Sequence, residues 1–345
     1  PQRHLHGFHR TILDESGRQL SVDFRSDYRA WLMTNCPTIN PDVTGLTFND
    51  HRAWPYKLPE EVHPTRWTGD TAVNFIETYK EPQPFFLKVS FTRPHSPYDP
   101  PQRIWDMYDG VDLPKANVGA WAGKYAALSD YAPDYWHGDL GAEQVRVSRR
   151  GYYGAVTFID EQIGRILASL EKRRMLENTL IIYISDHGDM TGDHNLWRKS
   201  YAYEPSAKVP LLVRWPGGTL SEKRGATIDN PVEIRDMLPT MLDAAGDTEQ
   251  RAKVDGASLL SLIADRRAKW RDAIDLEHDV CYDESNHWTG MTDGTWKYVY
   301  HAHNGEDQLF NLKDDPFELH DLALDSGYTR RKREWRGRLI EHLSE

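Results

Sequence analysis

The sequence predicts an α/β fold, a sandwich in which helices cover a large mixed, mostly parallel sheet, followed by a small C-terminal α+β subdomain with an antiparallel sheet. Two apolar runs of strand length, 85–91 and 180–184, each lead into polar residues, and a helical pattern runs directly into the second. Beyond roughly residue 266, short strand patterns replace this order. We therefore expect a main domain over residues 1–265 and a subdomain over 266–345.

Composition sets limits on the class of protein. The chain has 345 residues with 39% apolar content, enough for a large core, and a net charge of −11, which argues against a nucleic-acid partner. It contains no apolar run of the roughly 18 residues that a membrane helix needs. The two cysteines, Cys36 and Cys281, exclude a disulfide framework and leave a single bridge possible.

The first part of the main domain brings one candidate residue to a strand end. Residues 66–80 predict a helix with Thr68 as its N-cap, and 85–91 predict a buried strand. The proline-rich loop 92–101 follows and places His95 just past that strand. Ligands bind outside the carboxyl ends of strands in open α/β sheets, so His95 is a candidate site residue.

The second part continues the alternation of helix and strand. Residues 150–176 predict a long helix, with isoleucines and a leucine on one face, that leads into the strand 180–184. A short strand with a turn over 209–218 and a helix over 231–245 follow. Residues 111–148 predict irregular surface structure. In the subdomain we expect three strands, at 273–276, 296–300 and 308–312. We expect a charged C-terminal helix from residue 328.

The most informative segment follows the strand 180–184. Asp186 and His187 come directly after Ser185, and Gly188 allows the backbone to turn behind them. An Asp and a His at this place can ligate a metal or act as acid and base. The charged residues that follow are Asp189, Asp193, His194, Arg198 and Lys199.

These residue types fit the transfer of a phosphoryl or sulfuryl group. Carboxylate and imidazole suit a divalent cation, and lysine suits a tetrahedral oxyanion. Such reactions need cationic groups and a metal that neutralise charge on the equatorial oxygens. The alternative for Lys199 is a surface charge paired with Asp193 or Glu204.

Four stretches of the chain resemble the formylglycine-dependent, arylsulfatase-like sulfatases of the alkaline phosphatase superfamily. The resemblance runs from about residue 55 to 325. The stretches are Pro84–Tyr98, Tyr152–Gly164, Ser185–Leu211 and, in the tail, Asp293–Tyr298 with Leu309–Leu312 and Asp314–Leu319. The resemblance implies an alkaline-phosphatase-like sandwich and hydrolysis of an aryl or carbohydrate sulfate to an alcohol and inorganic sulfate.

The resemblance also implies roles for particular residues. Asp186 and His187 correspond to metal ligands of the family, and the ion is most often calcium, although imidazole is a less usual calcium ligand. Lys199 and His95 correspond to residues that contact the sulfate. His194 corresponds to a residue with a substrate or leaving-group role, and Arg198 lies beside Lys199 as a further substrate-binding candidate.

Three motifs of the family are not found in these residues. They are an early Asp-Asp metal pair, a Lys-x-His motif, and the Cys/Ser-x-Pro-x-Arg motif that matures to the formylglycine nucleophile. Cys36 is followed directly by Pro37 and has no matching arginine, and Asp314-Asp315 belongs to the tail. Family order places the missing motifs upstream of Pro1, so we expect this chain to be the C-terminal two-thirds of a sulfatase.

Two other functions remain open from the sequence. One is a phosphonate or phosphate ester hydrolase of the same superfamily, because metal and lysine alone do not separate sulfate from phosphate. The other is a non-catalytic truncated homologue that binds sulfated glycans. The expected partner in each case is a small anionic ester or a sulfated sugar, without nucleic acid or membrane. A homo-oligomer is compatible with the sequence, and no compartment is predicted.

Overall fold

The computed structural model describes residues 5–14, 26–130, 132–217 and 224–344. The chain divides into two compact units. The first comprises residues up to 116 with 128–135 and 140–176, and the second comprises 117–127, 136–139 and the residues from 177 onward. The domain boundary predicted between 265 and 266 is a separate division and stays a prediction. None of the described helices combines the length and the apolar character needed to cross a bilayer.

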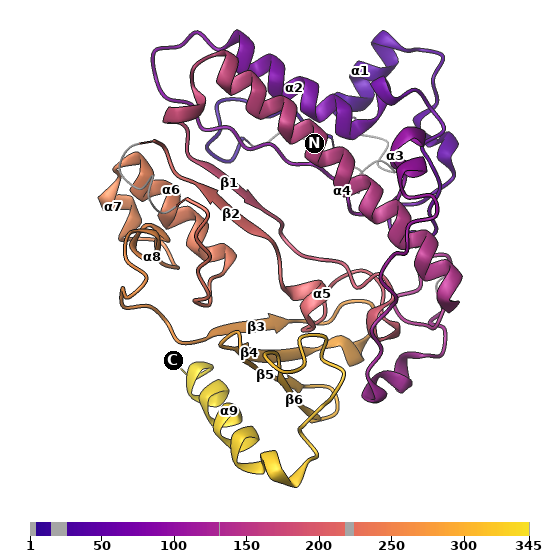
Figure 1. The fold of residues 1–345 in the computed structure, drawn as a ribbon, viewed down its shortest axis with the longest axis vertical. Helices are drawn as coiled ribbons and strands as arrows, with labels where there is room; N and C mark the ends of the chain where they lie inside the picture. Colours follow the sequence, from indigo (N-terminus) through magenta and orange to yellow (C-terminus); the bar gives the residue numbers. More distant parts are fainter. Residues whose placement is uncertain (1–4, 15–25, 131, 218–223, 345) are drawn as a thin grey trace. The chain divides into compact units, whose positions relative to one another are not determined.

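Two long helices form the framework of the first unit. α2 (Pro64–Thr78) and α4 (Gly141–Lys172) lie side by side (Figure 1). The N-cap of α2 is His63, not Thr68 as predicted. Pro64 takes the first helical position, where its missing N–H costs nothing, and His63 Nδ1 accepts a hydrogen bond from Thr65 N at 3.1 Å. α4 likewise begins before the predicted residue 150, so part of 111–148 is helical.

Smaller elements and a buried cluster complete this unit. They are the helices α1 (Asp27–Asn35) and α3 (Gln102–Met107) and the 3₁₀ turns Pro41–Thr44 and Glu60–Val62. The aromatic core contains Tyr28, Tyr56 and Trp67. Within the loop 92–101, Arg93 Nε donates to Asp99 Oδ1 at 2.9 Å, and both side chains are buried.

The strand predicted over 85–91 is not formed. The chain is extended there, but its residues alternate between partly covered and exposed, and Phe86 is 62% exposed. An apolar run becomes a buried strand only beside neighbours that take up its backbone hydrogen bonds. No strand pairs with this run in the described part of the chain.

The second unit begins with a two-stranded sheet. β1 (Ile181–Ile184) pairs antiparallel with β2 (Leu211–Arg214), as Figure 1 shows. β1 is only partly buried, contrary to the prediction. Every pair of described strands is antiparallel, so the expected mostly parallel sheet is not present among these residues. A parallel βαβ unit needs a strand on each side of its helix, and the run before α4 forms none.

An antiparallel sheet follows, as predicted for the C-terminal region, but in the described residues it has four strands where the sequence indicated three. Its strands lie in chain order: β3 (Ile274–His278), β4 (Trp288–Thr292), β5 (Trp296–His301) and β6 (Asp307–Asn311). α9 (Thr329–His342) packs on this sheet through Trp335 and Leu339, against Tyr298 and Leu309 (Figure 1). β4 was not predicted, because Thr289 and Gly290 interrupt its apolar pattern.

In the described part of the chain, four short helices lie between β1 and β3, the first of them between β1 and β2 and the other three between β2 and β3. They are α5 (Glu204–Ala207), α6 (Met237–Ala245), α7 (Thr248–Arg251) and α8 (Leu260–Ala264). α6 and the 3₁₀ turn before it account for the helix predicted over 231–245, and residue 218 of the predicted 209–218 segment lies outside the described residues. Cys36 and Cys281 are both free thiols, so the single bridge left open by the sequence is not formed.

Candidate functional site

The end of β1 presents a carboxylate and an imidazole to solvent. Ser185 Oγ donates to His187 O at 2.7 Å, and His187 N donates to Asp186 Oδ1 at 3.0 Å, so the chain turns sharply after the strand. The side chain of Asp186 is 85% exposed and that of His187 is 33% exposed. Both groups are therefore accessible to an ion or a substrate.

Gly188 fastens this turn to the start of α5. Its N–H donates to Ser206 O at 2.8 Å. A Cβ at this position would lie 2.0 Å from Pro205 O, closer than any side chain can approach. Glycine is therefore required by close backbone packing, and it fixes where Asp186 and His187 stand relative to α5.

The donor chemistry of this pair fits part of a metal site. His187 Nδ1 lies 2.7 Å from Gly188 O, which favours the tautomer with a proton on Nδ1 and the lone pair on Nε2. Nε2 lies 3.9 Å from Asp186 Oδ1. Calcium takes six to eight oxygen ligands. Among the described residues no group of three or more His, Cys, Asp or Glu is arranged to hold an ion, so the pair would supply only a fraction of a coordination shell.

The loop after this pair has an unusual backbone. Five residues other than glycine have positive φ: Thr191, His194, Asn195, Arg198 and Ser200. Met190 N donates to Arg198 O at 2.7 Å and Gly192 N to Leu196 O at 2.9 Å, which closes the loop on itself. Such conformations persist only where surrounding structure imposes them, and they concentrate at functional sites.

Lys199 lies in a partly buried, charged setting at the end of this loop. Burial lowers the pKa of its ammonium, and Asp189 opposes that effect. Asp186 also acts on the pKa of Lys199, so the lysine lies within electrostatic reach of the β1 end. The carboxylates considered as surface partners have other contacts. Asp193 Oδ1 accepts from Asn117 N at 2.6 Å, and Glu204 pairs with Lys208 and Lys297.

His194 is packed inside the second unit. It is 1% exposed, and its ring lies 4.6 Å from that of Trp121 and 5.4 Å from that of Tyr203. Gly119 N donates to its Nδ1 at 3.3 Å. Burial lowers the pKa of His194 to about 4, so the ring is neutral at neutral pH. This setting favours a packing role over the substrate or leaving-group role that the sequence predicts.

His95 lies in the first unit, whereas the other predicted residues lie in the second. Its ring stacks on Phe48 with centroids 4.3 Å apart, and its Nδ1 lies 2.9 Å from Ser96 O. In the second unit, Arg198 places its guanidinium over the ring of Tyr282, with Cζ 5.0 Å from the ring centroid. Asp186, His187, Arg198 and Lys199 therefore belong to one loop system.

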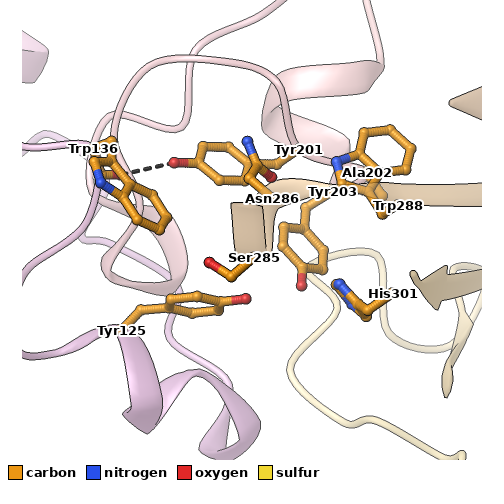
Figure 2. A pocket seen from close by; sticks show the side chains of 9 residues that line it. All are labelled: Tyr125, Trp136, Tyr201, Ala202, Tyr203, Ser285, Asn286, Trp288 and His301. Atoms are coloured by element: carbon orange, nitrogen blue, oxygen red, sulfur yellow. Dashed lines mark hydrogen bonds between the residues drawn. The ribbon is translucent and has the colours of Figure 1, made fainter. Parts of the chain in front are cut away.

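Sequence reasoning did not locate an aromatic pocket in the second unit. Figure 2 shows Trp136 and Tyr201 on one side of it, with the Tyr201 hydroxyl donating to Trp136 O at 2.8 Å, and Asn286 beside them. The amide nitrogen of Asn286 is buried and has no hydrogen-bond partner within the described residues. The twelve Trp and seventeen Tyr of the sequence gave no signal for this pocket, since its lining comes from segments far apart in the chain.

Comparisons with known proteins bear on the whole chain. The sulfatase family profile matches residues 11–247, and the profile of the N-sulphoglucosamine sulphohydrolase C-terminal region matches residues 192–345. The chain is 36% identical to the arylsulfatase of Clostridium perfringens, with 99% of this chain and 73% of the relative aligned. It is 35% identical to the choline-sulfatase of Rhizobium meliloti over 70% of this chain and 46% of that relative.

Solved structures share the fold. The phosphonate monoester hydrolase of Agrobacterium radiobacter matches with a TM-score of 0.75 at 24% identity, covering 91% of this chain and 68% of that one. A protein solved with its substrate D-glucosamine-2-N,6-O-disulfate matches with a TM-score of 0.67 at 22% identity, covering 82% of this chain and 69% of the other. These likenesses confirm the predicted alkaline-phosphatase-like fold class, although the strand pairs of the described residues are antiparallel.

Proposed function

Because this chain belongs to the sulfatase family, we propose that the end of β1 and the loop 189–200 form the anion-binding side of a site that hydrolyses sulfate esters. The observation that carries the proposal is local. Asp186 and His187 follow the end of β1, and two adjacent cations, Arg198 and Lys199, lie near the end of the loop 189–200. A sulfate ester needs such cations, because negative charge is distributed over its oxygens in the transition state.

Each residue has a distinct task in this proposal. Lys199 supplies a compact positive charge to a sulfate oxygen, and its lowered pKa reflects the partial burial that strengthens such an interaction. Arg198 offers a planar donor edge suited to two oxygens of one anion. His95, which the family resemblance assigns to the sulfate, would donate an imidazole N–H to it. His194 supports the loop through its packing rather than contacting substrate.

Asp186 and His187 would hold a divalent cation, with calcium first among the candidates. The exposed carboxylate offers oxygen ligands, and the tautomer favoured by Gly188 O leaves His187 Nε2 suited to ligation. When bound, the cation would polarise a sulfuryl oxygen as a Lewis acid. Other ligands would have to complete the shell, since this pair supplies a minority of the six to eight that calcium takes.

The nucleophile of the family is a formylglycine that is formed from a Cys or a Ser. A Cys/Ser-x-Pro-x-Arg motif does not occur among the 345 residues. The chain spans 73% of the arylsulfatase and 46% of the choline-sulfatase, and a formylglycine would belong to the part of such a protein that these residues do not span. Experiments on activity therefore use the protein at the full length encoded by its gene.

The substrate class follows from the same reasoning. A small aryl sulfate or a sulfated sugar fits a site that recognises the sulfate through cations and leaves the alcohol part to surrounding side chains. A relative named choline-sulfatase and a fold neighbour solved with a sulfated glucosamine support a small sulfated ligand of this kind. Substrate profiling with different sulfate esters identifies the alcohol part.

The test compares two matched aryl esters. We expect kcat/KM for an aryl sulfate to exceed that for the corresponding aryl phosphonate monoester, measured with calcium present. Faster turnover of the phosphonate would instead support the phosphonate hydrolase alternative, which the structural likeness supports at the level of fold alone. Binding of a sulfated glycan without turnover of either ester would support the non-catalytic alternative.

A further inference from the structure

Arg198 is a cation that lacks a carboxylate partner in the part of the chain that the structure describes. Its side chain is partly buried, and its Nε is buried without a hydrogen-bond partner. The neighbouring Lys199 carries the same charge, and Arg198 is one of the groups that lower its pKa. Two adjacent cations in a partly desolvated loop repel each other, so something other than ion pairing must hold the guanidinium in place.

The contact recorded for this guanidinium is the ring of Tyr282. The Cζ atom of Arg198 lies 5.0 Å from the ring centroid, within the range of a cation–π interaction. Tyr282 comes from the connection between β3 and β4, far from Arg198 in sequence. Both residues have left-handed backbones, with φ of 69° for Arg198 and 67° for Tyr282. A bulky residue keeps such a conformation only where its surroundings enforce it.

The surroundings of Tyr282 include two further aromatic side chains. Its ring stacks on Trp136 with centroids 6.0 Å apart and planes 20° apart, and it lies 6.4 Å from the ring of Tyr201. Trp136 and Tyr201 are themselves joined by the hydrogen bond drawn in Figure 2. The Tyr282 ring therefore packs against the rings of Trp136 and Tyr201, and these contacts hold its orientation.

This geometry suits an anion. The N–H groups of a guanidinium lie in its own plane, so a guanidinium over an aromatic ring can donate to an anion without losing its contact with the ring. The edge that carries these N–H groups is the part of arginine that binds two oxygens of a sulfate or carboxylate. The ring also compensates the charge without using up any N–H donor.

We propose that Tyr282 is a positioning residue, which holds the guanidinium of Arg198 against an aromatic stack so that its N–H edge binds the sulfate of the substrate. The proposal rests on the proposed sulfatase function and adds to it. It makes the β3–β4 connection of the C-terminal region a determinant of substrate binding. Since Arg198 contacts the substrate before the reaction as well as during it, the loss of its positioning should appear in KM more than in kcat.

The test compares Tyr282→Leu, which removes the ring, with Tyr282→Phe, which keeps it. In the full-length protein assayed on an aryl sulfate, Tyr282→Leu should raise KM about three- to tenfold with kcat changed less than about twofold. Tyr282→Phe should restore KM to within about twofold of the unsubstituted protein. Tyr300→Leu is the matched control, because Arg336 lies over the Tyr300 ring at 5.5 Å in a pair that takes no part in the site.

Three outcomes would overturn the proposal. One is an unchanged KM in a folded Tyr282→Leu protein, and another is a Tyr282→Phe protein as impaired as Tyr282→Leu. Should Tyr282→Leu not fold, Arg198→Gln provides the measurement, and an unchanged KM there is the third. If the unsubstituted protein turns over sulfate esters and the variants have the same KM, this inference alone fails. If the unsubstituted protein does not turn over sulfate esters, the proposed function fails with it.

Discussion

Asp186 carries the metal part of the proposal at the scale of single residues. Its carboxylate is the most exposed group of the candidate site. Among the described residues, the basic group near it is the imidazole of His187, whose Nε2 lies 3.9 Å from Asp186 Oδ1. An exposed carboxylate at a strand end, fixed by a glycine that cannot be replaced without a clash, is well placed for ion binding. Its removal should therefore change metal content and not the fold.

We expect Asp186→Ala in the full-length protein to lose most of its bound divalent cation with little change in melting temperature, because the side chain is exposed. Elemental analysis after gel filtration measures the metal content. Asp314→Ala is the matched control, since Asp314 is an exposed aspartate of the tail whose carboxylate accepts a hydrogen bond from Asn311 Nδ2. A folded Asp186→Ala protein with undiminished metal would contradict the assignment.

At the scale of elements, a buried lysine joins β5 to its neighbours. Lys297 is 1% exposed, and its Nζ lies 2.7 Å from Glu204 Oε1 and 2.8 Å from Glu318 Oε1. Burial by itself would lower the pKa of Lys297, but the two carboxylates outweigh it and raise that pKa. For Glu318 burial prevails and raises the pKa. The lysine is therefore charged and is needed to compensate two acidic groups.

Lys297→Met should lower the free energy of unfolding by about 3–5 kcal/mol, because it leaves the buried Glu318 and the partly buried Glu204 without their cation. Lys208→Met is the matched control. Lys208 also pairs with Glu204, at 3.3 Å, but its side chain is 76% exposed, and its loss should cost about 0–1 kcal/mol. Chemical denaturation of both variants measures the difference. Equal costs would show that burial of the ammonium does not set the energy of this cluster.

The elements also show what the sequence could predict. Helical spacing in 150–176 indicated α4, and the apolar runs in 296–300 and 308–312 indicated β5 and β6, because those patterns are local. The run 85–91 was misread because a strand depends on a partner that no local pattern reports. β4 was missed for the opposite reason, since its pairing with β3 and β5 forms a strand from a weak pattern.

The same distinction applies to the candidate site. The sequence predicted Asp186, His187, Arg198 and Lys199 because they follow one strand in one short segment. It could not predict the stack on Tyr282, which lies far along the chain. Nor could it predict that Trp121 and Tyr203 enclose His194 and keep it neutral, because that environment is created by folding.

At the scale of the whole molecule, the proposed function assigns Lys199 and His95 to the same sulfate group. A cation aimed at charge that develops in the transition state contributes about 3–4 kcal/mol, whereas two groups on one anion have effects that do not simply add.

The central claim is tested most directly by kcat/KM for an aryl sulfate in four full-length proteins: the unsubstituted enzyme, Lys199→Ala, His95→Ala and the double variant. The account predicts a loss of about 10²–10³ in each single variant, little change in melting temperature, and a double variant less impaired than the product of the two losses. A loss below about fivefold in either single variant, or two losses that multiply in full, would contradict a shared sulfate site.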